Sequence, residues 1–382
     1  MKYRNIIVLA LAVATLVCVG LVMLTSTSVW IESEDARYSH LTKQSVFLVI
    51  GVIVATFLAR FDYTILKRKK WLIYLGFIVS TILLASLYIK GIGITVNGST
   101  RWISLPVLGQ FQPSELAKLT TIILIAYWYS HYQAEVRSLF KGFIWPSLLL
   151  GISTILIFFE KDMGTAAALG SAGLSVIFIA GARLRFIIPS VVAASFVAFH
   201  YVQSDENRWS RIMAFMDLEN NALGKGYQQM RALCAFGNGG MSGMGVGFGA
   251  EKRSYLPFPH TDFIFPAIGE EMGWVTFLVV LCFVVYAAFG FIVAWQAKDT
   301  FGRYLAIGLT TVVVIPAMVN IGVTTASLPN TGLPLPFVSY GGTNLVVTLA
   351  TVGLLMSIGL RGRVKKEESK VDVLLQNTDI RI

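Results

Sequence analysis

Charged residues are scarce in this sequence of 382 residues. Asp, Glu, Lys and Arg make up 14% of the chain, whereas an average soluble protein has about 25%. Hydrophobic residues make up 55%, and the mean hydropathy is +0.69. Such a chain cannot cover a water-facing surface with polar groups. The composition therefore predicts an integral membrane protein and excludes a disordered, collagen-like or coiled-coil chain.

Cysteine and the common catalytic motifs are equally sparse. The three cysteines, Cys18, Cys234 and Cys282, lie far apart, so no disulfide framework or thiolate metal site is indicated. The four histidines are also scattered, and the sequence has no P-loop, nucleophile elbow or haem motif. An internal repeat is not evident, which argues against an inverted-repeat transporter without excluding it.

Ten apolar stretches approach the ~20 residues that a membrane-spanning helix needs. They cover residues 5–25, 44–60, 71–89, 115–130, 143–159, 165–181, 186–203, 263–295, 303–326 and 343–360. The eighth is too long for one crossing, so it is expected to be tilted or to begin with a re-entrant or surface segment. We therefore predict an all-α membrane protein with ten transmembrane helices in one domain, 1–360. A long extracytoplasmic loop, about 204–262, should separate the seventh and eighth helices.

The net charge of +10 is explained by its distribution. If the N-terminus is cytoplasmic, most of the 31 basic residues fall in cytoplasmic connections, as the positive-inside rule expects. Both termini are therefore predicted to be cytoplasmic, and no nucleic-acid partner is needed to account for the charge. The charged tail, 361–382, lacks a core pattern and is predicted to be a cytoplasmic end outside the domain.

Ionisable residues near the outer ends of the spans are candidates for function, because burying them in a membrane is costly. Arg101 and Trp102 offer an anion contact and an interfacial ring. Glu115 and Lys118 lie three residues apart, on one face of a helix predicted to begin at residues 113–114. The alternative is an interfacial belt with an internal ion pair.

Carboxylates also gather in two further outer segments. The turn EKDMGT, residues 160–165, carries two of them, although it equally fits a turn that only reverses the chain. Asp262 directly precedes an apolar helix, and Glu270 and Glu271 follow inside the same stretch. An acid at a helix start can be merely a cap. Unpaired carboxylates in an apolar stretch are costly, however, which favours a functional role for Asp262.

Two outer segments are rich in glycine or proline. Glycines between residues 226 and 265 could bring backbone N–H groups to a phosphate, or could pack helices closely. Residues 327–344 contain three prolines and three glycines, which predicts a rigid turn that presents Ser339, Tyr340 and Thr343, or simply a structured connection. Together the outer segments suit a lipid-linked phosphate substrate.

Several motifs together identify a family. RWISL, QPSELAK, GYQ…GNGGMSGMGVGFG, PHTDFIF…GEE and TGLPLPFVSYGG resemble, in this order, the SEDS proteins (shape, elongation, division and sporulation) over nearly the whole chain. GFGAEKRSYLP and LPFVSYGG are more similar to the division branch, FtsW, than to the elongation branch, RodA; the sporulation branch, SpoVE, stays open.

The resemblance implies the SEDS fold and a peptidoglycan glycosyltransferase. Such an enzyme polymerises lipid II at the outer face of the bacterial cytoplasmic membrane, releases undecaprenyl pyrophosphate, and works with a class B penicillin-binding transpeptidase and other divisome or elongasome proteins. The family's catalytic acid maps onto Asp262, for which we predict the role of general base. Predicted substrate-binding residues are Arg101, Trp102, Glu115, Lys118 and Ser339. A divalent cation, Mg or Mn, is expected at the pyrophosphate, with Asp262 as a candidate ligand.

Two departures from the family pattern concern substrate contacts. Phe258 and Pro259 stand where Pro-Glu often precedes the HTD triplet, and EKDMGT replaces a turn that usually reads like QPDLGT.

Two other functions remain open. A lipid II flippase would move lipid without making polymer, and a non-enzymatic division scaffold would tolerate changes in the polar cavity.

Overall fold

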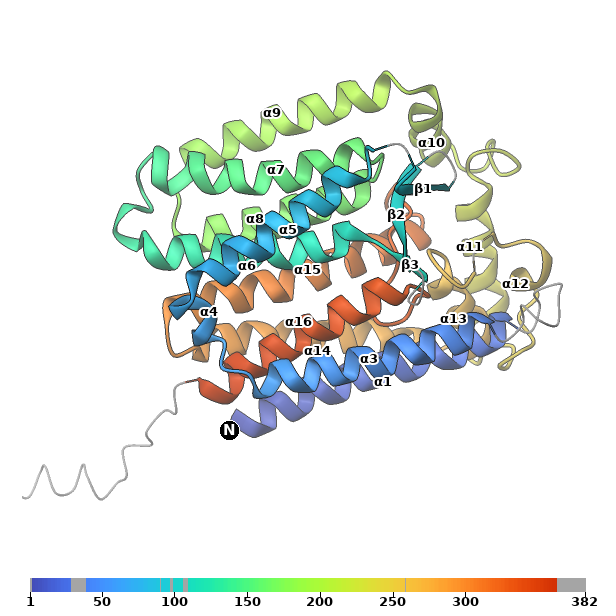
Figure 1. Cartoon of the computed structure of the whole chain (residues 1–382). Coiled ribbons are helices and arrows are strands. Elements are labelled where there is room, and N and C mark those ends of the chain that lie inside the picture. The colour runs from blue at the N-terminus through green and yellow to red at the C-terminus, as the bar shows by residue number, and fades with distance from the viewer. Residues whose placement is uncertain are drawn as a thin grey trace, which may run out of the picture.

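The computed structural model describes residues 2–28, 39–89, 91–96, 99–105, 109–257 and 259–362. This part of the chain is mostly helical. Figure 1 shows the long helices side by side in one bundle. The N-terminus lies at one end of the bundle, and the strands of residues 93–111 and the short helices of residues 206–272 gather at the other end.

Eight of the described helices are long and apolar enough to cross a membrane. They are α1 (Lys2–Ser28), α3 (Ser39–Arg60), the continuous pair η2 (Phe140–Ile144) and α7 (Trp145–Phe159), α8 (Met163–Ala180), α9 (Leu184–Gln203), α14 (Val275–Gln296), α15 (Thr300–Thr324) and α16 (Gly342–Arg361). Two more helices, α5 (Lys70–Ser86) and α6 (Pro113–His131), occupy the predicted third and fourth spans. The protein is a multi-pass membrane protein.

Helix α15 lies at the centre of the bundle and packs against α14, α6 and α8. Glycines make the close approaches possible. A Cβ on Gly290 of α14 would lie 2.3 Å from Thr310 Oγ1, and one on Gly308 would lie 2.4 Å from Ile122 Cγ2 of α6. Lipid offers no hydrophobic force between helices, so such close packing through small residues holds membrane helices together.

The prediction of an all-α fold is wrong for residues 93–111. Strands β1 (Gly93–Val96), β2 (Ser99–Leu105) and β3 (Gly109–Phe111) form an antiparallel sheet in the order β1-β2-β3. Trp102 pairs with Ile94, and Ile103 pairs with Phe111. Thr, Trp and Ile favour strands, but β1 and β3 are short, and in β2 the adjacent Trp102 and Ile103 break the alternation of apolar and polar residues. The sheet carries Arg101 and Trp102.

The eighth apolar stretch does begin with a separate segment. Helix α13 (Ile264–Met272) ends at Gly273, which has a φ of +52°, and α14 begins at Val275. A side chain at position 273 would collide with Met241 O, 2.3 Å from the added Cβ. Only glycine fits this break.

Residues 204–262, predicted as the long loop between the seventh and eighth spans, include short helices. They contain α10 (Glu206–Met216), α11 (Tyr227–Gly239) and α12 (Glu251–Ser254). At the other end of the bundle, the short helix α4 (Thr64–Arg68) connects α3 to α5. The predicted charged tail lies outside the described residues from position 363 onward.

Candidate functional site

The backbone around Asp262 is fixed by the segment 320–340. The carbonyl oxygens of residues 260, 261 and 262 accept hydrogen bonds from Tyr340 N (2.9 Å), Ser339 Oγ (2.6 Å) and Asn320 Nδ2 (2.8 Å). The same segment also approaches the carboxylate, since a Cβ on Gly332 would lie 3.4 Å from Asp262 Oδ2. The proline- and glycine-rich turn therefore holds the acid in place.

Ser339 uses its hydroxyl inside the protein. Besides donating to Thr261 O, its Oγ accepts a hydrogen bond from Leu335 N at 2.8 Å, and the residue is buried. These bonds support a positioning role for Ser339, whereas the sequence predicted a substrate contact.

Arg101 connects the sheet to the turn between α7 and α8. Its Nη1 lies 3.3 Å from Asp162 Oδ2, and its Nη2 donates to Lys161 O at 2.9 Å. Asp162 in turn caps α8 by accepting a hydrogen bond from Thr165 N at 3.1 Å. The turn EKDMGT thus does more than reverse the chain, because it anchors the predicted anion-binding arginine.

Asp262 has an unusual protonation equilibrium. Burial raises its pKa to about 7; Arg101 and Arg211 of α10 oppose this effect, while Asp162 adds to it. A carboxyl group with a pKa near neutrality is suited to exchange protons with a substrate at physiological pH. The structure thus brings Asp262 into the electrostatic range of Arg101, Asp162 and Arg211.

Glu160 is a further buried acid beside this group. It is 3% exposed, and neither carboxyl oxygen has a hydrogen-bond partner in the described part of the chain. Burial and the charge of Asp162 raise its pKa to about 9, against the opposing charge of Arg101. Sequence reasoning left Glu160, Asp162 and Arg211 out of the site. The two closely spaced carboxylates of EKDMGT were a signal for the first two, and nothing marked Arg211.

Glu115 and Lys118 form the internal ion pair that the sequence left open as the alternative to substrate binding. Lys118 Nζ lies 2.9 Å from Glu115 Oε1 near the start of α6, and both side chains are buried. Glu115 Oε2 has no hydrogen-bond partner among the described residues. Trp102 lies on β2 and is partly exposed. The hydrogen bonds and ion pairs of the described residues do not connect this pair or Trp102 directly to Asp262.

The glycine-rich segment gives its N–H groups to the protein's own carboxylates. Gly247 N donates to Glu271 Oε2 at 3.0 Å, and Ala250 N and Glu251 N donate to Glu270 Oε1 at 3.0 Å each. The segment also fits tightly on α13, because a Cβ on Gly243 would lie 2.4 Å from Glu271 O. Of the predicted roles, close packing is confirmed, whereas these N–H groups are occupied and do not offer a phosphate site.

Glu271 also forms a buried ion pair. Its Oε1 contacts Lys252 Nζ, its Oε2 accepts a hydrogen bond from Ser26 Oγ at 2.6 Å, and the lysine and glutamate side chains are 1% and 0% exposed. Lys252 Nζ also donates to Ser26 O at 3.2 Å. The pair joins α12 and α13 to the end of α1, so Glu271 has a structural explanation.

The described residues contain no group of three His, Cys, Asp or Glu side chains that could hold a metal ion. The carboxylate of Asp162 already forms an ion pair with Arg101. This part of the protein therefore does not fit a metal site built from its own side chains.

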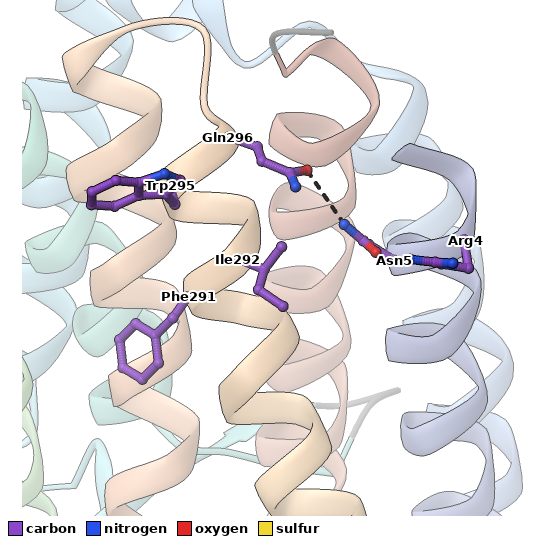
Figure 2. Close-up of a pocket in the computed structure, with 6 residues that line it drawn as sticks. All are labelled: Arg4, Asn5, Phe291, Ile292, Trp295 and Gln296. Carbon is purple, nitrogen blue, oxygen red and sulfur yellow. Dashed lines mark hydrogen bonds between the residues drawn. The ribbon is translucent and has the colours of Figure 1, made fainter. Parts of the chain in front are cut away.

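Two cavities lie at the end of the bundle far from Asp262. The larger, of about 500 Å³, lies between the start of α1 and the end of α14, where Asn5 Nδ2 donates to Gln296 Oε1 at 3.3 Å (Figure 2). The other, of about 440 Å³, lies beside the start of α9. Neither is part of the site around Asp262.

The fold and the polar centre define a class: a multi-pass membrane protein with a titratable acid fixed at one end of its bundle. Residues 6–363 match the family of FtsW, RodA and SpoVE, described as cell cycle proteins. The chain belongs to this family.

Relatives similar to the chain carry the names of the division and sporulation branches. It is 40% identical over 357 residues to a "Probable peptidoglycan glycosyltransferase FtsW" of Trichlorobacter lovleyi, covering 92% of each chain. It is 36% identical to the protein of the same name from Geobacter metallireducens, covering 94% of this chain and 95% of the relative. It is 35% identical to "Stage V sporulation protein E" of Bacillus subtilis, covering 94% and 97%.

Solved structures agree with this family. A chain of a peptidoglycan synthase complex, studied for the coordination of polymerization and crosslinking, matches with a TM-score of 0.73 and 26% identity, covering 92% of this chain and 96% of that one. The rod shape determining protein RodA of Thermus thermophilus matches with a TM-score of 0.67 and 25% identity, covering 93% and 97%.

Proposed function

We propose that the chain is a peptidoglycan glycosyltransferase that polymerises lipid II into glycan strands. The observation that carries this proposal is Asp262, an acid with a pKa of about 7, fixed by three hydrogen bonds to its backbone segment and placed within range of Arg101 and Arg211. The names of the FtsW relatives support the same activity.

Ten spans and a cytoplasmic N-terminus complete the proposal. Helices α5 and α6 would cross the membrane together with the eight longer helices, in a single domain 1–360. The sheet, Asp262 and residues 204–262 would then lie at the outer face of the bacterial cytoplasmic membrane, and both termini on the cytoplasmic side. The basic residues near the other end support this orientation.

Asp262 would act as the general base. Its carboxylate takes the proton from the 4-hydroxyl of the acceptor sugar, and the resulting oxygen forms a bond to C1 of the donor sugar. The bond between C1 and the pyrophosphate oxygen breaks, and undecaprenyl pyrophosphate leaves with the electron pair. Arg101 and Arg211 carry the positive charge that would stabilise the developing anion. Lys118 is less suited to this role because it is buried against Glu115.

We propose a divalent cation, Mg or Mn, only as an ion bound to the pyrophosphate of the substrate. Mg²⁺ commonly binds through one or two carboxylates together with substrate phosphates. Since the described residues do not form a three-residue site, no step is assigned to the ion. Asp262 is the candidate protein ligand.

The partner would be a class B penicillin-binding transpeptidase within the divisome, or within the elongasome if the chain serves elongation. A peptidoglycan synthase complex among the similar structures supports such a partnership. The polyprenyl tails of lipid II would lie in the membrane along the apolar faces of the helices.

The experiment that tests the proposed function is polymerisation of labelled lipid II by the purified protein with its cognate transpeptidase. Glycan strands are expected. A flippase would instead move lipid II across vesicles without making polymer, and a scaffold would bind the transpeptidase without doing either. Either of these results, with folded protein, would contradict the proposal.

The activity should rise with pH through about 7. Asp262 serves as a base only when ionised, and burial raises its pKa to about 7, so the rate should increase about tenfold per pH unit below this value and level off above it. The measurement is the initial rate of polymerisation between pH 5.5 and 8.5. Glu160→Gln should keep the same midpoint, because Glu160 titrates at about 9. A midpoint near 4 would contradict the assignment.

Ser339→Ala should lower both stability and activity. The change leaves the buried Leu335 N–H without its acceptor and removes the donor to Thr261 O, which costs about 1–3 kcal/mol of unfolding free energy. It also loosens the segment that holds Asp262. Unfolding in detergent and polymerisation rate measure the two effects. Ser175→Ala is the matched control, because Ser175 is partly exposed and its hydroxyl bonds within α8, and this substitution should change neither. If Ser339→Ala and Ser175→Ala had the same stability and the same polymerisation rate, the positioning role of Ser339 would be contradicted.

A further inference from the structure

The cavity beside the start of α9 is strongly basic. It is lined by Arg137, Gly181, Arg183, Leu184 and Arg185. Three of these five residues are arginines and none is acidic. We refer to this cavity of about 440 Å³ as the arginine cavity.

The three guanidinium groups are not neutralised by the rest of the described structure. Arg137, Arg183 and Arg185 are exposed, and none forms an ion pair with a described carboxylate. The nearby Glu135 is already paired with Lys141, at 2.9 Å. Three like charges around one cavity repel one another, so an anion bound between them would relieve the repulsion.

Helix α9 adds to the attraction for an anion. Arg183 is its N-cap residue, and no side chain caps the helix there. The N-terminal end of a helix carries a partial positive charge and favours phosphate groups. The helix end and the arginines therefore point to the same ligand chemistry.

An apolar stripe leads from the arginine cavity along α9. Leu184, Ile188, Val192 and Phe196 are spaced by four residues, so they lie on one face of the helix, and they are 51%, 57%, 62% and 71% exposed. Figure 1 shows α9 at the edge of the bundle. A charged cavity that continues into an exposed apolar stripe fits an amphiphile, whereas a free phosphate ion would use only the cavity.

We propose that the arginine cavity binds the phosphate headgroup of an anionic phospholipid, whose acyl chain lies along the α9 stripe. Basic pockets between transmembrane helices at a membrane surface are suited to such headgroups. The site lies at the opposite end of the bundle from Asp262 and is independent of the proposed reaction.

The test is binding of phosphatidylglycerol and of phosphatidylcholine to the full-length protein, measured by native mass spectrometry from mixed micelles. The wild type should prefer phosphatidylglycerol. Arg183→Gln with Arg185→Gln should weaken phosphatidylglycerol binding by roughly fivefold for each arginine removed. The corresponding lysine variants keep the charge and should retain most of the binding. Because these side chains are exposed, the unfolding temperature of lipid-free protein should not change.

Arg4→Gln is the matched control. It removes one positive charge at the same end of the bundle, but Arg4 lines the other cavity (Figure 2). This variant should bind phosphatidylglycerol as the wild type does. If Arg4→Gln lost as much phosphatidylglycerol binding as is expected for each arginine of the arginine cavity, general surface charge would explain the binding and the proposal would be overturned. No preference for phosphatidylglycerol over phosphatidylcholine, or complete displacement by millimolar inorganic phosphate, would overturn it as well.

Discussion

Asp262→Asn is expected to abolish polymerisation of lipid II while the protein stays folded. Asparagine has nearly the same shape but cannot accept the proton of the acceptor hydroxyl. A positioned general base contributes about 10²–10⁴-fold to a rate, so the variant should lose at least two orders of magnitude. The backbone hydrogen bonds of residues 260–262 do not involve the carboxylate and should remain.

The control for this variant is Asp217→Asn. Asp217 is exposed in the same 204–262 region, and among the described residues its carboxylate accepts hydrogen bonds from Asn220 Nδ2 alone. The substitution makes the same change of charge without touching the site, so the polymerisation rate should stay within twofold of the wild type. Comparable losses in both variants would show that the charge of the outer region, and not the base at 262, determines the rate.

Lys252→Met is expected to have the largest effect on stability. Removing the lysine leaves the Glu271 carboxylate, which is 0% exposed, without its cation. Breaking a buried pair in this way typically costs about 3–5 kcal/mol, since an uncompensated charge stays buried. The unfolding temperature in detergent should fall clearly. The junction of α12, α13 and α1 should be the first part of the protein to become accessible to proteolysis.

Two further variants separate the charge from the packing. Lys141→Met breaks the ion pair with Glu135, whose side chains are about half exposed, and should have little effect because water and salt screen such pairs. The double variant Lys252→Met with Glu271→Leu removes both buried charges and should recover part of the stability. A stability of Lys252→Met equal to that of Lys141→Met would contradict the structural role of the buried pair.

Local patterns in the sequence predicted the parts of the fold and site that depend on local spacing. Long apolar stretches marked the helices, and the three-residue spacing of Glu115 and Lys118 placed both on one helix face, where they form an ion pair. The length of the eighth stretch indicated either a tilted helix or a separate first segment, and the structure has the second, α13.

Contacts between distant segments could not be predicted in this way. Arg101 meets Asp162 across 61 positions, and Ser26 meets Glu271 across 245. Neither pair follows a helix or strand period, so only the folded bundle brings the groups together. The same holds for Ser339, whose place in the sequence suggested a presented hydroxyl, although the folded chain uses it to hold Thr261.

The sheet of residues 93–111 was missed for a different reason. Two of its strands are only three or four residues long, and the third, β2, places Trp102 next to Ile103, so its sequence does not alternate apolar with polar residues. Glu270 and Glu271, by contrast, led to an expectation that the structure explains in another way. Their position in an apolar stretch favoured a functional role for Asp262, but the glycine-rich segment and Lys252 satisfy both carboxylates.

The most direct test of the central claim compares wild type and Asp262→Asn in lipid II polymerisation with the cognate transpeptidase, from pH 6 to 9. The wild type should produce glycan ladders at a rate that rises through about pH 7 and then levels off. Asp262→Asn should produce none at any pH while it still binds the transpeptidase. Ladders from the variant at a rate within tenfold of the wild type would contradict the role of Asp262 as the base.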